Sequence, residues 1–487
     1  MNTKLLKQKI LDLAIRGKLT QQLKSDGTAA DLLKEISSAS HSRPSGTREG
    51  IHTVHAKKGA KSKDLKQIIP LDKNEAPFEL PANWEWVRLG DLCKASSGKT
   101  PSTSQKEFWN GNVLWVTSKD VKQKYIDSTQ ICLSDLGASS MQLYPPKTMI
   151  IVGRSGILRH SLPVAILKKS ATVNQDLKAL VFKDNRIVEF IYAVIKGMEQ
   201  HLLHEYKKAG TTVDNLNFDL FLTAPIPLPP LAEQQRIVAK IEEAFAEIDA
   251  IEKNKELLKT HIKQTRQKIL DLAIHGKLVP QNKSDEPASV LLERITRDNP
   301  HYEKIEDEPF EIPENWAWCR LGNLSESIQY GYNAPAKDSG RIKMVRISDI
   351  HENEVEWDSV PYCDIDDKEI QTYLLKKNDI LFARTGGTVG KSFIVSNLPG
   401  DAVYAGYLIR TRYGKNANAQ YMKYFMESNL YWEQLRDGCI ATAQPNCNGK
   451  TLGKMQIPLP PLAEQSRIVA KIEELFSTLD QMERNLI

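Results

Sequence analysis

The sequence predicts a mixed α/β (α+β) fold: two globular domains related by a pseudo-two-fold axis and joined by two long antiparallel helices that form a coiled coil. Three observations carry this prediction. Long stretches of the chain occur twice, a seven-residue apolar repeat runs through one of them, and two unlike segments with short β-rich runs lie between the repeated stretches. We expect the copies to be arranged circularly, so that the chain begins and ends within the same long helix.

Pairs of nearly identical stretches make up the internal repeat. They are ILDLAIRGKL (10–19) and ILDLAIHGKL (269–278), SDGTAADLLKEI (25–36) and SDEPASVLLERI (284–295), PFELPANWEWVRLGDL (77–92) and PFEIPENWAWCRLGNL (309–324), and PLPPLAEQQRIVAKIEE (227–243) and PLPPLAEQSRIVAKIEE (458–474). The last pair differs at a single position. One structural unit is therefore built twice along the chain.

A long helix is predicted from about residue 232 to residue 274, some 43 residues or roughly 60 Å at about 1.5 Å per residue. Its apolar residues recur every seven positions in two seams, which only Lys255 and Thr265 interrupt. The first seam holds Ile237, Ala244, Ile251, Leu258 and Leu272, and the second holds Ile241, Ile248, Ile262 and Ile269. In the second copy the same rhythm is kept by Ile468, Ile472, Leu475, Leu479, Met482 and Leu486.

The spacing of the copies explains why the chain starts in the middle of a pattern. The PLPPLAEQ copies lie 231 positions apart, so the last residue, Ile487, corresponds to Glu256. The ILDLAI copies lie 259 positions apart, so Met1 corresponds to Thr260. The two chain ends therefore meet within one helix copy. The first long helix leads from the earlier domain to the later one and the second must lead back, which predicts an antiparallel pair.

These patterns divide the chain into seven expected segments. They are an amino-terminal helix that completes the second long helix (1–22), a basic linker (23–76), a first globular domain (77–230), a central long helix (231–280), a second linker (281–308), a second globular domain (309–461) and a carboxy-terminal helix (462–487). Residues 37–76 exceed their counterpart, 296–308, by 27 residues and are polar and basic, which predicts a flexible surface linker.

The segments between the repeats, 90–224 and 322–455, share few identities, and we call them the first and second variable domains. Their apolar strands nevertheless match in place. LWVTSKDV (114–121) corresponds to KMVRISDI (343–350), and MIIVGRSG (149–156) corresponds to ILFARTGG (380–387). The latter two each end in Arg, then Ser or Thr, then Gly. Glycine allows close backbone approach, and an arginine fork suits phosphates or guanine edges. The alternative is a strand end whose arginine is merely solvated.

Composition narrows the class of protein. The 487 residues are 41% hydrophobic and 26% charged, which is typical of soluble chains with about three units. No apolar run reaches the roughly 20 residues of a membrane span, and the six cysteines form no CxxC pair, so we expect a cytoplasmic protein without zinc or disulfides. The net charge of +5 permits nucleic-acid binding. The first variable domain has 17 Lys and Arg against 12 Asp and Glu, whereas the second has 16 of each.

Motifs for catalysis are incomplete. GGTVGKS (386–392) is one residue short of a phosphate-binding loop, and the GKT at 98–100 has Cys93 where the first glycine should stand. The triplet Glu205-Tyr206-Lys207 is isolated, and such triplets arise by chance in charged chains.

Two further catalytic signals fail as well. His201 and His204 stand one helical turn apart with no cysteine or third histidine near them in the sequence, so we expect surface residues and not metal ligands. The chain contains no Asn/Asp-Pro-Pro-aromatic tetrapeptide of the amino-methyltransferase type. We therefore expect a chain that is not itself an enzyme and that carries no cofactor or metal.

The repeated PLPPLAEQ-x-RIVAKIEE, the repeated ILDLAI-x-GKL and the interleaved variable domains resemble the specificity subunit of type I restriction-modification systems, over essentially the whole chain. This resemblance implies two target recognition domains, each reading one half of an asymmetric bipartite site in double-stranded DNA. It implies two modification subunits that carry S-adenosylmethionine and bind the shared helices, and restriction subunits that use ATP and magnesium. Two different readers suit unlike half-sites, and nearly identical helices suit two copies of one partner.

We select candidate DNA-binding residues at strand ends and in basic stretches of both variable domains. They are Thr117, Ser118, Lys119, Arg154, Ser155, Lys207, Lys208 and Thr211 in the first, and Arg346, Ser348, Arg384, Thr385, Lys391 and Lys450 in the second. The alternative function is a coiled-coil scaffold whose two domains bind proteins or glycans.

Overall fold

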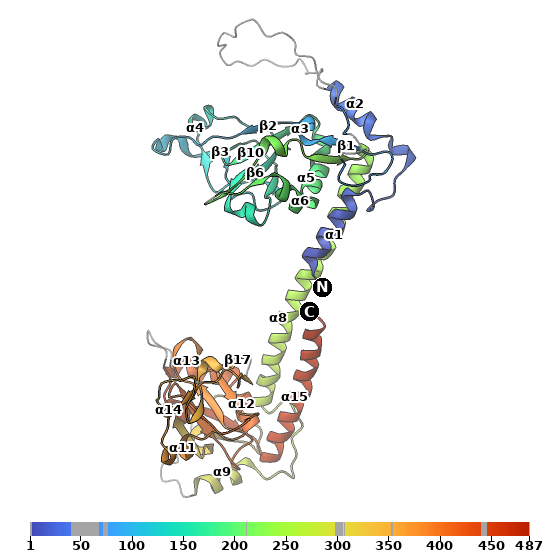
Figure 1. Ribbon diagram of the computed structural model, residues 1–487. Coiled ribbons are helices and arrows are strands. Elements are labelled where there is room, and N and C mark those ends of the chain that lie inside the picture. The colour runs from blue at the N-terminus through green and yellow to red at the C-terminus, as the bar shows by residue number, and fades with distance from the viewer. Residues whose placement is uncertain are drawn as a thin grey trace. The chain divides into compact units, whose positions relative to one another are not determined.

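The structure is a computed structural model, and it describes residues 2–39, 68–71, 76–210, 212–297, 305, 307–351, 354–439 and 446–486. The chain forms two compact units, Met1–Lys253 and Asn254–Ile487, and the division falls within one continuous helix (Figure 1). Each unit combines helices with β-sheets, as the repeat predicts. Across the described residues, we find no helix with the length and apolar character that a membrane span requires.

Unit 1 contains the first variable domain and the helices that flank it. Its helices are α1 (Thr3–Ile15), α2 (Ala29–Ala39), α3 (Leu89–Leu92), α4 (Asp135–Ser139), α5 (Val188–Gly197), α6 (Glu199–Tyr206), α7 (Phe218–Phe221) and the first part of α8 (Leu231–Ile274). Its strands are β1 (Glu85–Arg88), β2 (Cys93–Ser97), β3 (Trp109–Val116), β4 (Tyr125–Ile126), β5 (Cys132–Leu133), β6 (Met149–Val152), β7 (Arg154–Ser155), β8 (Val164–Leu167), β9 (Ala171–Val173), β10 (Leu177–Phe182), β11 (Lys207–Lys208), β12 (Asp214–Leu216) and β13 (Pro225–Leu228).

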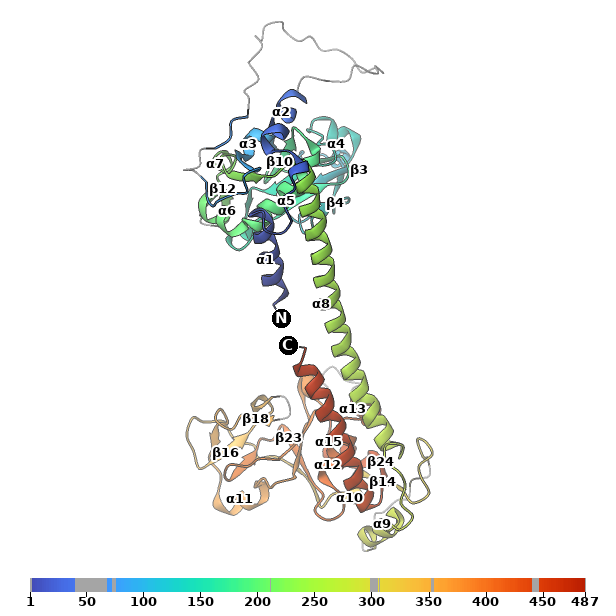
Figure 2. The same cartoon turned by 90° about the vertical axis from the view of Figure 1, so that its right-hand side faces the viewer.

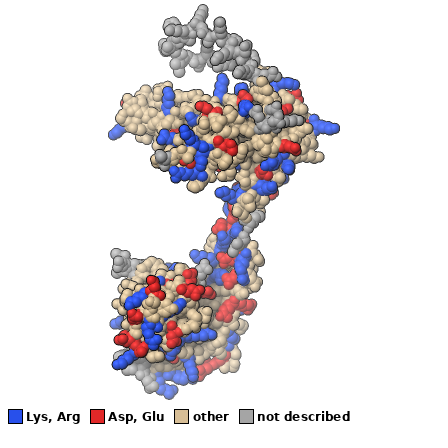
Figure 3. Space-filling view, in the orientation of Figure 1, with Lys and Arg blue, Asp and Glu red and all other residues tan. Residues whose placement is uncertain are grey.

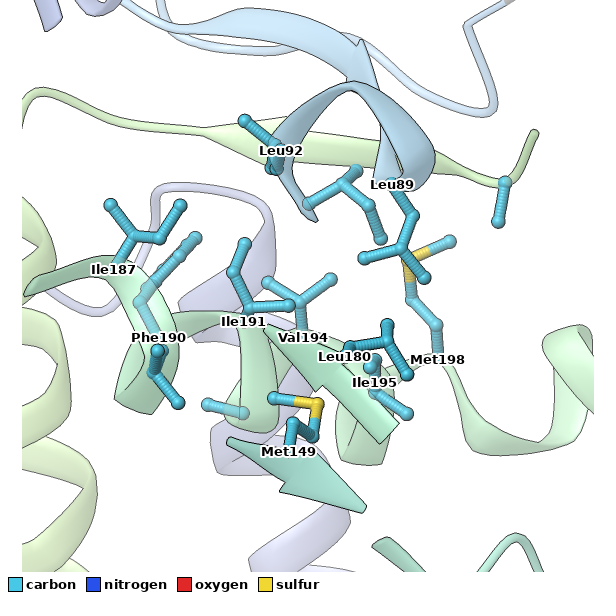
Figure 4. Packing of buried hydrophobic residues seen from close by; sticks show 14 of the residues in the cluster. Leu89, Leu92, Met149, Leu180, Ile187, Phe190, Ile191, Val194, Ile195 and Met198 are labelled. Atoms are coloured by element: carbon cyan, nitrogen blue, oxygen red, sulfur yellow. The ribbon is translucent and has the colours of Figure 1, made fainter. Parts of the chain in front are cut away.

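A five-stranded sheet, in the order β2-β10-β6-β8-β4, is the centre of unit 1. Helix α5 packs on one face because its apolar residues recur every three or four positions. Figure 4 shows this layer, in which Phe190, Ile191 and Val194 of α5 meet Met149 of β6 and Leu180 of β10. The opposite face packs against the sheet β5-β3-β9. A third sheet, β11-β12-β7, and the pair β1-β13 complete the unit.

Unit 2 repeats this plan with different strands. Its helices are the second part of α8, α9 (Ala288–Thr296), α10 (Leu321–Leu324), α11 (Asp367–Tyr373), α12 (Ala419–Phe425), α13 (Asn429–Cys439), α14 (Gly449–Lys454) and α15 (Leu462–Arg484). Its strands are β14 (Ala317–Arg320), β15 (Ser327–Tyr330), β16 (Ile342–Val345), β17 (Ile350–His351), β18 (Glu354–Val355), β19 (Tyr362–Cys363), β20 (Ile380–Ala383), β21 (Ser392–Ile394), β22 (Ala402–Tyr404), β23 (Leu408–Arg412) and β24 (Gln456–Leu459). The sheets have the orders β15-β23-β20-β21, β19-β16-β22, β14-β24 and β17-β18.

The long helix predicted over about 232–274 is confirmed as α8, Leu231–Ile274. In unit 1, α1 lies beside the first part of α8, and in unit 2, α15 lies beside the second part (Figure 2). We call α1, α8 and α15 the helical frame. Lys7 near the start of α1 pairs with Asp249 of α8, whereas Asp26, beyond the end of α1, pairs with Arg236 at 2.6 Å. Later residues of one segment thus meet earlier residues of the other, so α1 and α8 are antiparallel.

Unit 2 makes the same contacts at the positions that the two repeat spacings predict. Arg266 of α8 pairs with Asp480 of α15, and Arg467 pairs with Asp285 at 2.7 Å. Helices α8 and α15 are therefore antiparallel as well. The amino-terminal helix consequently stands in the same relation to unit 1 as the later part of α8 does to unit 2, which supports the circular arrangement of the copies.

One part of the seam prediction is wrong. The second seam is buried, with Ile248 and Ile262 each 4% exposed, but Ile251 and Leu258 of the first seam are 50% and 40% exposed. The reason is that a seam is buried only where a partner helix covers it. In unit 1 the partner α1 begins at Thr3, which bonds to Glu252, and in unit 2 the partner α15 ends at Arg484. Leu258 therefore lies between the ends of the two partners, and Ile251 lies level with the first turn of α1, where Leu5 is itself 67% exposed.

The two segments predicted as linkers contain short packed helices. In segment 23–76, α2 buries Leu32, Leu33 and Ile36 in the core of unit 1. In segment 281–308, α9 buries Leu291 and Leu292 in the core of unit 2. Much of the predicted basic linker, namely 40–67 and 72–75, lies outside the described residues.

Candidate nucleic-acid interface

Two turns of unit 1 lie at the same end of the first variable domain. Strand β3 ends at Val116, whose carbonyl accepts from the Asn174 amide at 3.0 Å. Two residues beyond Asn174, the carbonyl of Asp176 accepts from the Arg154 amide at 3.1 Å. The turn that begins at Thr117 and the turn that begins at Arg154 are therefore held against one connection between β9 and β10.

Unit 2 holds its corresponding turns in the same way, 229 to 231 positions later. The Ala405 amide donates to Val345 at 2.9 Å, and the Arg384 amide donates to Tyr407 at 3.2 Å. The sequence correspondence of the two pairs of strands is thus confirmed by equivalent backbone hydrogen bonds. The side chains on these turns, however, have unlike surroundings in the two units.

Four candidates of unit 1 come together on the sheet β11-β12-β7. Asn215 of β12 lies between Arg154 of β7 and Lys208 of β11. Lys207 precedes Lys208 on β11. The Arg154 side chain is exposed and has no hydrogen bond or ion pair among the described residues. Ser155 instead caps the following turn, because its Oγ accepts from the Ile157 amide at 3.3 Å.

Asp214 on β12 organises the basic side chains around it. Its carboxylate is 3.4 Å from Lys207 and 3.9 Å from Arg159. The Gly210 amide donates to it at 3.2 Å, and this bond, together with Lys207 and against the effect of burial, holds the pKa of Asp214 below its ordinary value. The carboxylate therefore stays ionised and positions two cations beside Arg154. Sequence reasoning missed Arg159, since it lies in a short 3₁₀ turn with no motif.

A polar cleft of about 500 Å³ opens beside this sheet, lined by Ser97, Lys178, Lys208, Asn215 and Asn217 among others. The Lys178 ammonium donates to Ser97 Oγ at 2.6 Å and lies 5.2 Å from the centre of the Phe218 ring. Lys178 was not predicted as a candidate because it lies within β10, an otherwise apolar strand. Its side chain reaches the cleft only because of the elements that pack beside this strand.

The remaining candidates of unit 1 differ in availability. Thr117 donates from its amide and its hydroxyl to Asp120 at 2.8 and 2.7 Å, so it shapes the turn. Ser118 is half-buried and Lys119 is exposed. Thr211 lies outside the described residues.

In unit 2, Arg346 has a structural partner. Its guanidinium reaches the carboxylate of Asp349 at 2.7 Å, and Asp349 is 3% exposed. The hydrogen bond to Asp349 raises the pKa of Arg346. Ser348 also donates to Asp349, at 3.3 Å. Arg346 therefore occupies the place of Thr117 and holds the same kind of turn with a charged side chain.

Arg384 lies over an aromatic ring. The centre of its guanidinium is 4.7 Å from the Tyr330 ring, and its Nη1 donates to the Gly406 carbonyl at 3.4 Å. The Tyr330 hydroxyl accepts from the Gly449 amide at 2.9 Å, which brings Lys450 to the same place. Thr385 follows Arg384 and forms a β-bridge with Asn446.

The structure thus gathers Arg384, Thr385 and Lys450 around Tyr330, with Tyr407 beside them at 65% exposure. Both tyrosines were missed, because a lone tyrosine in a strand or loop gives no sequence signal of its neighbours. Exposed aromatic rings beside arginine suit stacking on bases or sugar rings. The remaining candidate, Lys391, is exposed at the end of the turn between β20 and β21.

Charge is distributed differently on the two units. Figure 3 shows Lys and Arg gathered on the visible face of unit 1, whereas both signs are interspersed on unit 2. This agrees with the excess of basic residues in the first variable domain and the equal numbers in the second. Basic surface favours contact with the phosphate backbone.

The near-miss motifs keep a structural role. GGTVGKS (386–392) forms a 3₁₀ turn and then strand β21, whereas a phosphate-binding loop needs a helix after its lysine. His204 pairs with Glu205 on the exposed face of α6. Within the described part of the chain, no group of three or more His, Cys, Asp or Glu side chains is placed to hold a metal.

Two unlike domains lie on one repeated helical frame, and each carries basic side chains at equivalent strand ends. The family described as type I restriction modification DNA specificity domain matches residues 81–260 and 313–487. The chain belongs to this family.

Known proteins resemble the chain over most of its length. The EcoAI specificity subunit of a type I restriction enzyme from Escherichia coli is 25% identical over 557 aligned positions, which cover 98% of this chain and 90% of that protein. The solved HsdS subunit from Thermoanaerobacter tengcongensis has a TM-score of 0.53 at 18% identity and covers 85% of this chain and 94% of its own. A chain from a type I restriction-modification complex gives 0.55 at 19% identity, over 84% and 94% of the two chains. These structures share the fold.

Proposed function

We propose that the chain is the DNA specificity subunit of a type I restriction-modification complex, in which each variable domain reads one half of an asymmetric bipartite target. The observation that carries this proposal is the pair of equivalent turns with unequal side chains. Arg154 and Arg384 leave equivalent strands on equivalent backbone hydrogen bonds, but one is exposed and the other stacks on Tyr330. Equal frames with unequal contact surfaces suit two different half-sites.

The contacts to DNA come, in this proposal, from the candidates and from side chains that the structure adds. In unit 1 these are Arg154, Lys207, Lys208, Lys119 and the newly found Arg159 and Lys178. In unit 2 they are Arg384, Thr385, Lys391 and Lys450 with Tyr330 and Tyr407. Ser118, Ser155, Thr211 and Ser348 stay as candidates, while Thr117 and Arg346 act mainly by shaping their turns.

A domain exchange tests the two readers. Residues 90–224 are replaced by the corresponding domain of a relative, and the methylated motif is read by sequencing host DNA. We expect one half-site to change and the other to stay, because the second variable domain is untouched. Exchange of 322–455 is the matched control and should change the other half-site. A change of both half-sites in either exchange would refute independent reading.

In this proposal, each copy of the helical frame binds one modification subunit. These partners supply the S-adenosylmethionine and the methylation chemistry. This chain is then not itself catalytic. Restriction subunits would add ATP- and magnesium-dependent cleavage.

Some of the residues that are identical in the two copies are explained by contacts within the chain itself. Buried Glu233 accepts from Trp84 at 2.9 Å and from Gln22 at 3.0 Å, and its copy Glu464 accepts from Gln281 at 2.6 Å.

The exposed identical residues need another explanation, and a shared partner provides one. On α8 they include Ala232, Ala239 and Glu243, which share one face of the helix, with Lys240 beside them, and on α15 the copies are Ala463, Ala470 and Glu474, with half-buried Lys471 beside them. Small alanines next to the Lys240–Glu243 and Lys471–Glu474 pairs allow a partner helix to approach closely. We call these two sets the alanine stripes.

Bulky charge on one alanine stripe tests this assignment. Ala239→Arg and Ala470→Arg should each remove one of two modification subunits, because each blocks one stripe and leaves the buried contacts of the frame intact. Native mass spectrometry of the complex gives the stoichiometry. Ser139→Arg, on an exposed position of α4, is the matched control and should keep both subunits. Full stoichiometry in both alanine variants would place the partners elsewhere.

A further inference from the structure

The turn that follows β7 presents one large apolar side chain to solvent. Ile157 is 48% exposed and lies in the 3₁₀ turn Gly156–Arg159. Arg154 stands three residues before it and Arg159 two residues after it, and both arginines are exposed. Exposed isoleucines are common on protein surfaces. This isoleucine, however, stands among the cations of the candidate nucleic-acid interface.

Hydrogen bonds and burial of its neighbour fix the position of Ile157. Its amide donates to Ser155 Oγ at 3.3 Å, and its carbonyl accepts from the amides of His160 and Ser161, each at 3.0 Å. The next residue, Leu158, is fully buried in the core of unit 1. The turn therefore holds the isoleucine outward before any ligand arrives, and a residue held in this way loses little conformational entropy on binding.

Cations around the turn favour contact with DNA. Asp214 lies opposite Ser155 on the neighbouring strand, and its carboxylate is 3.4 Å from the Lys207 ammonium and 3.9 Å from the Arg159 guanidinium. Arg154 adds a further positive charge. Phosphates attract these cations. The apolar side chain between the two arginines then comes to the DNA surface without a phosphate to contact, so its partner must be an apolar group.

Gly387 is the counterpart of Ile157 in unit 2, because it stands three residues after Arg384. A Cβ atom at Gly387 would meet no atom of the described chain within 4 Å. The second unit therefore has room for a side chain at this place but carries none. Packing does not impose the difference between the two turns, and an apolar group at this position is a property of the first variable domain.

The edges of DNA bases offer one apolar group, the 5-methyl group of thymine, which lies in the major groove. The same groove presents the guanine atoms N7 and O6, which suit an arginine fork. A turn that carries Arg154 and Ile157 three residues apart can therefore contact a hydrogen-bonding edge and a methyl group in one groove. In the minor groove there is no methyl group, and apolar side chains act there as wedges between base steps.

We propose that Ile157 is a specificity-determining residue that reads the 5-methyl group of a thymine in the half-site of the first variable domain. The inference rests on the proposed function and names one base that the first domain requires. In unit 2, Gly387 has no side chain for that contact and lets the backbone approach the DNA closely. The two half-sites are therefore distinguished at corresponding turns by different groups.

The test uses the chain assembled with its modification subunits and duplexes of the target that methylome sequencing gives. Each thymine of the first half-site is replaced in turn by uracil, which lacks only the 5-methyl group, and affinity is measured by fluorescence anisotropy. One replacement should weaken binding roughly fourfold, the factor that corresponds to one buried methyl group. With Ile157→Ala the same replacement should have no effect. Ile157→Val keeps most of the apolar side chain and should stay sensitive to it.

The second half-site provides the matched control. Uracil placed there should change the affinity of the unchanged chain and of Ile157→Ala by the same factor, because another domain reads that half-site. Thermal unfolding of Ile157→Ala should match the unchanged chain, since about half of the side chain is already exposed.

Three results would overturn the inference. They are a first half-site without thymine on either strand, affinities that no uracil replacement changes, and a uracil effect of equal size in Ile157→Ala. Equal weakening of thymine and uracil duplexes by Ile157→Ala would also exclude methyl reading and indicate a wedge. All of these results leave the proposed function standing, because the complex still binds its bipartite target. Failure to bind any bipartite target would overturn both.

Discussion

The two units join their variable domains to the helical frame by different chemistry. In unit 1, Lys124 lies between the domain and the frame, 2.9 Å from Glu189 of α5 and 2.7 Å from Glu242 of α8. In unit 2, the ring of Tyr424 from α12 packs edge-on against Phe476 of α15, with ring centres 5.9 Å apart.

The contacts within the frame are, by contrast, the same in both units. Lys7 lies over the Phe245 ring at 5.6 Å and Arg266 over Phe476 at 5.0 Å, each cation also pairing with the aspartate four residues further along the helix. The repeat therefore preserves the frame, while each domain contacts the frame through its own set of side chains. A change in the frame should therefore act alike on both units, and a change in an attachment should act on one.

Lengthening the frame should have the largest effect. One heptad is added after Lys255. A second heptad is inserted between Ile487 and Met1 in a variant whose chain ends are joined there. The two insertions keep the seams in register and extend the helices by about 10 Å. At about 3.4 Å per base step, this extension adds about three base pairs between the half-sites. We also expect lower methylation activity, because the two domains are rotated around the DNA relative to their half-sites. Methylome sequencing measures the spacer. Methylation confined to the original spacing would show that the frame does not set the distance.

Removal of the buried glutamate should destabilise both units alike. Glu233→Ala leaves Trp84 and Gln22 without their shared acceptor, so unit 1 should lose about 3 kcal/mol of free energy of unfolding. Glu464→Ala should cost unit 2 a similar amount, because Glu464 stands at the copied position. Urea unfolding of both variants measures this, and Glu233→Gln, which keeps an acceptor, is the matched control. A large loss in one unit only would contradict the equivalence of the frame.

The paired arginines should separate the two readers. Arg384→Ala should weaken DNA binding by the assembled complex by about 2 kcal/mol, within the range of one good base contact. Arg154→Ala should cost less, because its exposed side chain must be ordered on binding whereas Arg384 is already held by Tyr330. Tyr330→Phe keeps the ring and should bind almost normally, whereas Tyr330→Ala should reproduce part of the Arg384 loss. Affinities at several salt concentrations separate base contacts from phosphate contacts. Equal, unchanged affinities in both arginine variants would return these residues to the solvated alternative.

Loss of the lysine bridge should have the smallest effect and act on unit 1 alone. Lys124→Met should cost about 1 kcal/mol, since Glu189 keeps Lys147 at 2.8 Å as a partner. Burial lowers the pKa of Lys124, but the hydrogen bonds to Glu242 and Glu189 outweigh it and raise that pKa above its ordinary value. When the pKa of a lysine is higher in the folded state than in the unfolded state, its charge contributes full stability at pH values below the unfolded-state pKa. That contribution is lost as the pH rises through the folded-state pKa. The difference in stability between Lys124→Met and the unchanged chain, measured by thermal unfolding, should therefore be constant between pH 7 and pH 9. A difference that disappears within that range would contradict the bridge.

The repeat, the bounds of α8, the antiparallel direction of the frame and the correspondence of the two Arg-Ser/Thr-Gly turns could all be predicted from the sequence. These features follow from local rules, because heptad spacing and strand patterning are written in consecutive residues. The alignment of the strands also fixes which backbone amides correspond, as the bonds at Arg154 and Arg384, which lie 230 positions apart, show.

The contacts of individual side chains, by contrast, could not be predicted and depend on the folded arrangement of the elements. Arg154 and Arg384 are equivalent in sequence, yet one is exposed and the other lies on Tyr330, which stands 54 positions earlier in the chain. The roles of Lys178 and Tyr407 could not be predicted from the sequence for the same reason. Likewise, Ile251 fits its seam perfectly but is half exposed, because burial depends on where a partner helix ends. Periodicity specifies which face of an element is apolar, whereas contacts between elements distant in sequence specify what that face touches.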